Sequence, residues 1–190
     1  MLLRGINNLG SKPVAMAELR EVVTLIGHTD VMTYIQSGNV LFTPRLAVSS
    51  TAGPTGSAVL AAELERAIAD GTGVRARAVV LSGEELARCV DDNPYPGETN
   101  PRLLHAIFLP AIPPGMAAWV AEAERQVQGK GSRDQARLLG CTVYLHTPDG
   151  YPRSDLRRVL ARAGGPTSAP VAGTARNWAT VTRLAELCRP

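Results

Sequence analysis

The order of the expected secondary-structure elements constrains this chain more than any single motif does. Short β-rich segments and amphipathic helices follow one another as β-α-β-β-α-β, and the same order occurs a second time within the 190 residues. This order is typical of the ferredoxin-like fold. We therefore expect an α+β protein built from two ferredoxin-like βαββαβ subdomains in tandem, packed together, although the halves share no obvious residue repeat.

The first half takes its elements from hydrophobic spacing and turn residues. Apolar residues three or four positions apart mark helices, and the Gln36-Ser37-Gly38-Asn39 segment between two β-rich runs is typical of a hairpin turn. The expected elements are a strand over 2–6, a helix after Pro13, strands over 31–35 and 40–43, a loop over 44–57, a helix capped by Ser57, and a strand over 74–81.

A short helix and a proline-rich segment separate the halves. Ser82 and Glu85 fit a capping box at the start of the helix, and Asn93-Pro94-Tyr95-Pro96-Gly97 interrupts it. We expect a first subdomain with its connecting helix over 1–92 and a second subdomain with a C-terminal helix over 93–190. The second half should contain a strand over 103–109, a helix from Pro114, strands over 136–139 and 141–146, a helix from Ser154, a weak strand over 167–172, and a helix capped by Asn177.

Composition excludes several classes of protein. Hydrophobic residues make up 45% of the chain, enough for a core, yet no run of about 18 apolar residues could cross a membrane. The first residues lack the features of a signal peptide, so we expect a cytoplasmic protein without a membrane partner. Three cysteines without a CxxC pair and three scattered histidines predict neither a disulfide framework nor a metal site, and no cofactor is expected. The oligomeric state is left open.

The most specific motifs are spread from residue 3 to residue 178. They are Leu3-Arg4-Gly5-Ile6-Asn7, Met16-Ala17-Glu18-Leu19-Arg20, Tyr34-Ile35-Gln36-Ser37-Gly38-Asn39-Val40, Asn93-Pro94, Tyr144-Leu145-His146 and Thr174-Ala175-Arg176-Asn177-Trp178. Together they resemble the uncharacterised bacterial family catalogued as domain of unknown function 1697. The resemblance implies two ferredoxin-like subdomains and implies no activity, because no function is established for that family.

The chain departs from the family pattern at two places. Asn8-Leu9-Gly10-Ser11 stands where relatives carry Val-Gly-Gly after the first motif, and Ala179 follows Trp178 where Asn is common. The first strand also begins directly at Met1, which fits either a short strand or a chain that lacks its first residues. These changes weaken any strict transfer of binding details from the family.

Polar residues gather at one edge of the first half. In a ferredoxin-like sheet, with strand order 4-1-3-2, the loop after the first strand and the turn after the second lie at the same edge. The candidate ligand-binding residues there are Arg4, Asn7, Asn8, Lys12, Gln36, Ser37 and Asn39. Donors, amides and accessible backbone N–H groups beside a helix start can hold an anion. Alternatively, these are ordinary turn residues that tie the two loops together.

Arg176, Asn177 and Trp178 form the second candidate. Asn177 is explained as a helix N-cap, and Trp178 as an aromatic buried against the sheet. Arg176 just before a helix N-terminus is less expected, because the helix dipole disfavours a cation there. It would fit a partner carboxylate or a bound anion.

Three functional interpretations follow. The leading one is a binding module for a small anionic or nucleotide-like ligand at the first-half edge, closed over by Arg176–Trp178. The alternative is nucleic-acid binding through the second half, which carries 12 basic and 7 acidic residues. That interpretation is weak, because no run of aromatics suited to RNA is present. The third is an enzyme of unknown reaction, for which His105 and His146 on neighbouring strands offer no evident carboxylate partner and no catalytic residue can be assigned.

Overall fold

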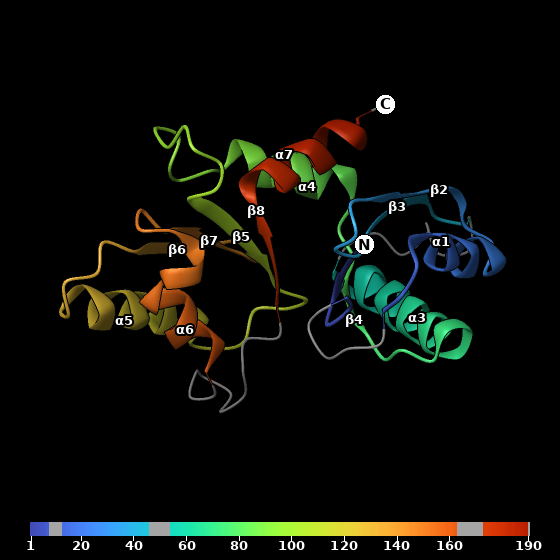
Figure 1. Ribbon diagram of the computed structural model, residues 1–190, viewed down its shortest axis with the longest axis horizontal. Coiled ribbons are helices and arrows are strands. Elements are labelled where there is room, and N and C mark those ends of the chain that lie inside the picture. Colours follow the sequence, from blue (N-terminus) through green and yellow to red (C-terminus); the bar gives the residue numbers. More distant parts are fainter. Residues whose placement is uncertain (8–12, 46–53, 163–172, 190) are drawn as a thin grey trace. The chain divides into compact units, whose positions relative to one another are not determined.

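The computed structural model describes residues 1–7, 13–45, 54–162 and 173–189. The chain divides into two compact units, Met1–Leu81 and Ser82–Pro190 (Figure 1). Each unit is built around its own four-stranded antiparallel sheet. The two-subdomain α+β fold expected from the element order is therefore confirmed, and the helix α4 (Gly83–Asp91) belongs to the second unit.

The first unit has the strand order β2-β3-β1-β4, which is the ferredoxin-like order. Two helices, α1 and α3, lie side by side and pack on one face of its sheet (Figure 1). Its elements are β1 (Leu2–Arg4), α1 (Met16–Leu25), β2 (Thr29–Tyr34), β3 (Asn39–Thr43), α3 (Pro54–Thr72) and β4 (Arg77–Val79).

The core of the first unit lies between the sheet and the two helices. Leu19 of α1, with Leu64 and Ile68 of α3, is completely buried. Leu3 and Val40 face them from the central strands. Burying each such side chain stabilises the unit by about 1.5–3 kcal/mol. Because side chains alternate along a strand, the inward direction of Leu3 places Arg4 on the opposite face.

The helix α3 begins earlier than the sequence indicates. Ser57 was expected to cap it, but α3 starts at Pro54, so Ser57 lies inside the first turns. Proline is favoured in the first turn because its missing N–H has no partner there in any case. The last strand of the unit is also shorter than expected, since β4 covers only Arg77–Val79. The intervening residues 46–53 lie outside the described part.

The second unit repeats the ferredoxin-like order as β6-β7-β5-β8. Helices α5 and α6 cover one face of its sheet, and α4 and α7 lie together on the other (Figure 1). Its elements are α4 (Gly83–Asp91), β5 (Leu104–Phe108), α5 (Met116–Gln128), β6 (Gln135–Leu139), β7 (Thr142–His146), a 3-10 turn (Tyr151–Arg153), α6 (Asp155–Ala161), β8 (Thr174–Asn177) and α7 (Trp178–Leu187).

A buried tyrosine joins α4 to this sheet. Tyr144 of β7 is 1% exposed, and its hydroxyl donates to the backbone oxygen of Cys89 in α4 at 2.8 Å. The expected capping box of α4 is present, with Ser82 and Glu85 each accepting from the other's backbone N–H. The sequence grouped this helix with residues 1–92, whereas its contacts assign it to the unit that begins at Ser82.

The strand expected over 167–172 falls outside the described residues. The fourth strand of the second sheet is β8, Thr174–Asn177, which pairs antiparallel with β5. It leads directly into α7, whose N-cap is Asn177 as expected. The Arg176-Asn177 pair therefore belongs to a strand end and not to a free loop.

No helix among the described residues is both long enough and apolar enough to span a lipid bilayer.

Candidate functional site

Two loops meet at the polar edge of the first sheet, as the sequence predicts. Asn7 has a left-handed backbone, with φ of 53°. Its side-chain amide donates to the backbone oxygens of Gln36 at 3.1 Å and Val14 at 3.2 Å, and its oxygen accepts from the N–H of Val14 at 2.7 Å. Asn7 thus joins three segments of chain. This contact corresponds to the alternative interpretation, in which Asn7 ties the loops together.

The turn between β2 and β3 is organised by its own polar groups. Asn39 is fully buried, and its amide donates to the backbone oxygen of Tyr34 at 3.0 Å and to the Ser37 hydroxyl at 2.9 Å. The N–H of Leu3 donates to the oxygen of Gly38 at 2.8 Å. Asn39 therefore shapes the turn, while Gln36 projects an exposed side chain at its tip.

Two arginines lie opposite one another at this edge. Arg4 at the end of β1 pairs in register with Arg77 at the start of β4. Both are exposed, and they occupy the same face of the sheet because directly paired residues point the same way. Arg77 also reaches Glu65 of α3, with Nη1 and Oε2 3.1 Å apart. Like charges directly opposite in a ladder are destabilising, and the Glu65 carboxylate compensates part of the positive charge at this edge.

Sequence reasoning missed Arg77. The alternation Arg75-Ala76-Arg77-Ala78 could have indicated it, because period-two spacing places both arginines on one side of a strand. Two predicted residues, Asn8 and Lys12, lie outside the described residues. The edge therefore presents Arg4, Arg77 and Gln36 as its exposed polar side chains, with Asn7, Ser37 and Asn39 supporting its shape.

The Arg176–Trp178 segment belongs to the second unit. Arg176 is buried, and its guanidinium donates to the Thr174 hydroxyl at 2.7 Å and to the backbone oxygen of Ala175 at 2.8 Å. Burial lowers the pKa of Arg176 to about 10, so it remains charged at neutral pH. Asn177 accepts from the N–H of Thr180 as an N-cap. Trp178 is half-buried against the Tyr144 ring, with centroids 6.1 Å apart.

The two histidines of the second sheet are adjacent in the ladder but point to opposite faces. His105 pairs with Leu145, and His146 pairs with Leu104, so alternation separates their rings. A joint metal or acid–base pair is therefore ruled out by geometry. A carboxylate that sequence reasoning did not find does lie beside one of them, because Nε2 of His146 is 2.8 Å from Oε2 of Glu98.

Glu98 comes from the segment that follows α4. Its other oxygen accepts from the N–H of Asn100 at 2.8 Å. That bond first, and His146 second, hold the pKa of the Glu98 carboxyl below its ordinary value. The Tyr95 ring covers the imidazole with centroids 5.3 Å apart, and burial raises the pKa of Tyr95 to about 12. Only the proline-rich composition around Tyr95 could have directed attention to this segment.

His105 lies under the other helical layer, where it has no evident catalytic partner. It is 8% exposed and stacks on Tyr151 with ring centroids 3.8 Å apart. Its Nδ1 has no hydrogen-bond partner among the described residues. Because burial disfavours the charged imidazolium, the pKa of His105 is lowered to about 4.

The free energy of unfolding should therefore decrease as the pH falls, because His105 is protonated more readily in the unfolded chain than in the folded one. The unfolded chain takes up a proton near pH 6.5, whereas the folded chain does so only near pH 4. Between these values the unfolded state binds more protons, so the free energy of unfolding should drop by about 2–3 kcal/mol as pH falls. Urea unfolding at pH 7 and pH 4.5 measures this drop.

The variant His105→Phe keeps a stacking ring and removes the titration. Its drop between the two pH values should be smaller by about 2 kcal/mol. His28 is also buried, and burial lowers its pKa as well. Because His28 is present in both proteins, the stability of the variant should still depend weakly on pH. An equal drop in wild type and variant would show that His105 does not carry the effect.

Part of the positive charge of the second half is compensated by acidic side chains. Basic residues of this half form ion pairs with nearby acids, among them Arg125 with Glu122, Arg133 with Asp149, Arg137 with Glu124 and Arg158 with Asp155. The strand aromatics Phe108 and Tyr144 are 1% exposed and cannot stack on bases. These two strand aromatics therefore give no support to the nucleic-acid interpretation.

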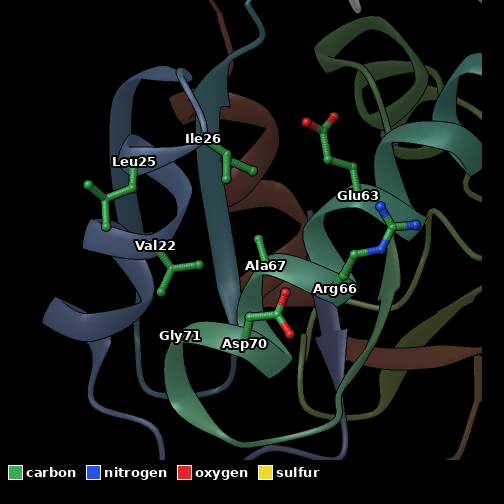
Figure 2. Close-up of a pocket in the computed structure, with 8 residues that line it drawn as sticks. All are labelled: Val22, Leu25, Ile26, Glu63, Arg66, Ala67, Asp70 and Gly71. Atoms are coloured by element: carbon green, nitrogen blue, oxygen red, sulfur yellow. The ribbon is translucent and has the colours of Figure 1, made fainter.

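A groove of about 390 Å³ runs between α1 and α3 of the first unit. Figure 2 shows Val22, Ile26 and Ala67 directed toward it, with charged side chains of α3 at the rim. It lies at the C-terminal end of α1, away from the polar edge where that helix begins, and contains none of the predicted residues. Its lining is Val22, Leu25, Ile26, Glu63, Arg66, Ala67, Asp70 and Gly71. Its inner wall offers mainly apolar contact.

Comparison with known proteins assigns the chain to a family. A family model described as "Protein of unknown function (DUF1697)" matches residues 1–144. The chain belongs to the DUF1697 family. No curated protein matches it. Among the described residues, no group of three or more His, Cys, Asp or Glu side chains could hold a metal ion.

A solved structure shares the fold of this DUF1697 protein. It is that of the conserved bacterial protein SP0830 from Streptococcus pneumoniae, with 21% sequence identity and a TM-score of 0.68. The match covers 99% of this chain and 96% of the other. At this identity the similarity shows the common two-unit architecture and nothing about activity.

Proposed function

We propose that this DUF1697 protein is a binding module for a small anionic or nucleotide-like ligand, held at the polar edge of the first unit. The observation that carries the proposal is the register pair of Arg4 and Arg77. Two exposed guanidinium groups on the same face of the sheet can contact one anion, and Arg77 also keeps its contact with Glu65.

Hydrogen bonds at this edge support the proposal. Asn7 bonds to the turn after β2, and Asn39 bonds within that turn. A preorganised edge loses less conformational entropy when it binds a ligand. Gln36 at the tip of the turn adds an amide that can accept from or donate to the uncharged part of a ligand. The scaffold therefore suits a ligand that combines an anionic group with a polar body.

Ligand-induced stabilisation tests the proposal. Thermal unfolding is followed with inorganic phosphate, pyrophosphate, a nucleoside diphosphate and citrate as probes. A probe at one hundred times its dissociation constant should add about 2.7 kcal/mol to the free energy of unfolding. Arg4→Gln should remove most of this increment, because it removes one of the two facing cations.

The matched control is Arg66→Gln on the exposed surface of α3. It makes the same change in net charge elsewhere on the first unit and should leave the increment intact. Stabilisation that survives Arg4→Gln would place the ligand elsewhere. Stabilisation that Arg66→Gln weakens as much as Arg4→Gln does would show that only the net charge of the protein matters.

A further inference from the structure

We propose that His146, positioned by Glu98, is a nucleophilic imidazole of a separate site in the second unit that takes small acyl electrophiles. This inference concerns the other sheet and does not depend on the anion site of the first unit. It follows from the orientation of the imidazole, from the side chains that continue the same face of β6, and from the contrast with the other two histidines.

The contact between Glu98 and His146 fixes the ring. Nε2 of His146 lies 2.8 Å from a carboxylate oxygen of Glu98. This nitrogen therefore carries the hydrogen and donates a hydrogen bond to Glu98. The lone pair then resides on Nδ1. That atom faces Gln135, whose side-chain oxygen is 3.4 Å away, longer than an ordinary hydrogen bond. Both side chains are partly accessible, with 19% of His146 and 18% of Glu98 exposed.

The face of β6 beside the imidazole provides the remaining groups. Gln135 pairs with His146, so alternation places Arg137 and Leu139 on the same face farther along the strand. All three are at least partly exposed. The amide of Gln135 and the apolar side chain of Leu139 suit a carbonyl compound with an apolar substituent, while Arg137 is held by Glu124 of α5, with Nη1 and Oε2 2.6 Å apart.

The chemical step is an acyl substitution at the imidazole. The lone pair on Nδ1 of His146 attacks the carbonyl carbon and forms an N–C bond. The bond from that carbon to the leaving oxygen breaks, and the leaving group departs with the electron pair. The Nε2 proton passes to the Glu98 carboxylate, which leaves a neutral acyl-imidazole. Water then adds to the acyl carbon, the C–N bond breaks, and Nε2 recovers its proton from Glu98.

The other histidines provide an internal comparison. His28 is 1% exposed and His105 is 8% exposed, and neither contacts a carboxylate among the described residues. If only His146 has an accessible, carboxylate-oriented imidazole, the three residues should react with an acyl electrophile at clearly different rates. This difference is measurable in the unaltered protein.

Diethyl pyrocarbonate is the probe, because it transfers an acyl group to neutral imidazole. At pH 8, above the ordinary pKa of histidine, the rate at each histidine is read by peptide mass spectrometry. His146 should react at least about tenfold faster than the other two. Glu98→Gln keeps a hydrogen-bond acceptor and removes the charge, and should slow modification of His146 about tenfold.

The direction in which Glu98→Gln changes the modification rate of His146 distinguishes two roles for Glu98. If Glu98 merely clamps the segment after α4 over the sheet, its replacement exposes the ring, and modification accelerates or stays unchanged. Either result, or a wild type in which His146 is not the fastest histidine, overturns the proposal. The control Glu84→Gln on the exposed first turn of α4 should leave the rate at His146 unaltered.

Turnover provides the second readout. Hydrolysis of p-nitrophenyl acetate by the full chain should exceed that by His146→Gln at least about tenfold, and Glu98→Gln should lower it similarly. His105→Gln should leave it unchanged, because that ring is buried on the other face. Equal hydrolysis by wild type and His146→Gln would contradict the proposed activity.

Discussion

Gly38→Ala should destabilise the first unit by about 3–4 kcal/mol, the largest single-residue effect that we expect at the polar edge. Gly38 has φ of +73°, where an L side chain is strained. A Cβ there would lie 2.7 Å from Cδ1 of Ile6 and 2.8 Å from Cβ of Leu3, both buried residues. Because Leu3 is held in the central strand, the clash cannot be relieved by a side-chain rotation alone. Urea unfolding of the full chain measures the loss.

Gly5→Ala is the matched control. Gly5 has φ of +85°, so the backbone cost is similar, but nothing lies within 4 Å of the Cβ that alanine would add. We expect a loss of only about 1–2 kcal/mol. The difference between the two variants isolates the packing of the turn against β1. Equal losses would show that the turn does not pack as tightly as its geometry indicates.

Tyr144→Ala should destabilise the second unit by about 3–5 kcal/mol. The ring is 1% exposed and contacts Trp178, and its removal would leave a cavity between the sheet and the layer of α4 and α7. The substitution also removes the hydroxyl that donates to the backbone oxygen of Cys89. Calorimetric unfolding measures the total cost.

Tyr144→Phe separates the hydrogen bond from the packing. It keeps the ring and leaves one buried acceptor without its donor, which should cost about 1–2 kcal/mol. Amide hydrogen exchange should accelerate in α4, whose Cys89 loses the bond, more than in α5 on the other face of the sheet. Unchanged protection of α4 would indicate that this contact does not hold the helix to the second unit.

The fold could be predicted because it depends on periodicity and on element order. The helical spacing of Leu19 with Val23, and of Leu64 with Ile68, appears directly as buried faces of α1 and α3. Chain order alone then gives the strand order of both sheets. Element boundaries were less accurate, because the local signal of Ser57 as a cap competes with Pro54 as a first helical residue. The side on which α4 packs depends on the long-range bond from Tyr144, which no local pattern encodes.

The candidate sites were predicted only where chain topology brings residues together. The meeting of Asn7 with the Gln36 turn follows from the ferredoxin-like strand order. The pairing of Arg4 with Arg77 depends on the exact register of β1 and β4, and that of Glu98 with His146 on the path of a long irregular segment. Neither is determined by local spacing, so the sequence could not reveal them.

Backbone amide mapping tests the proposed ligand site most directly. The full chain, labelled with ¹⁵N, is titrated with pyrophosphate, and shift changes are followed by NMR. The proposed site predicts that the largest changes fall on Gly5, Asn7, Gln36, Ser37 and Arg77, and that Arg4→Gln abolishes them. Changes that fall mainly in the second unit, or that persist unaltered in Arg4→Gln, would contradict binding at this edge.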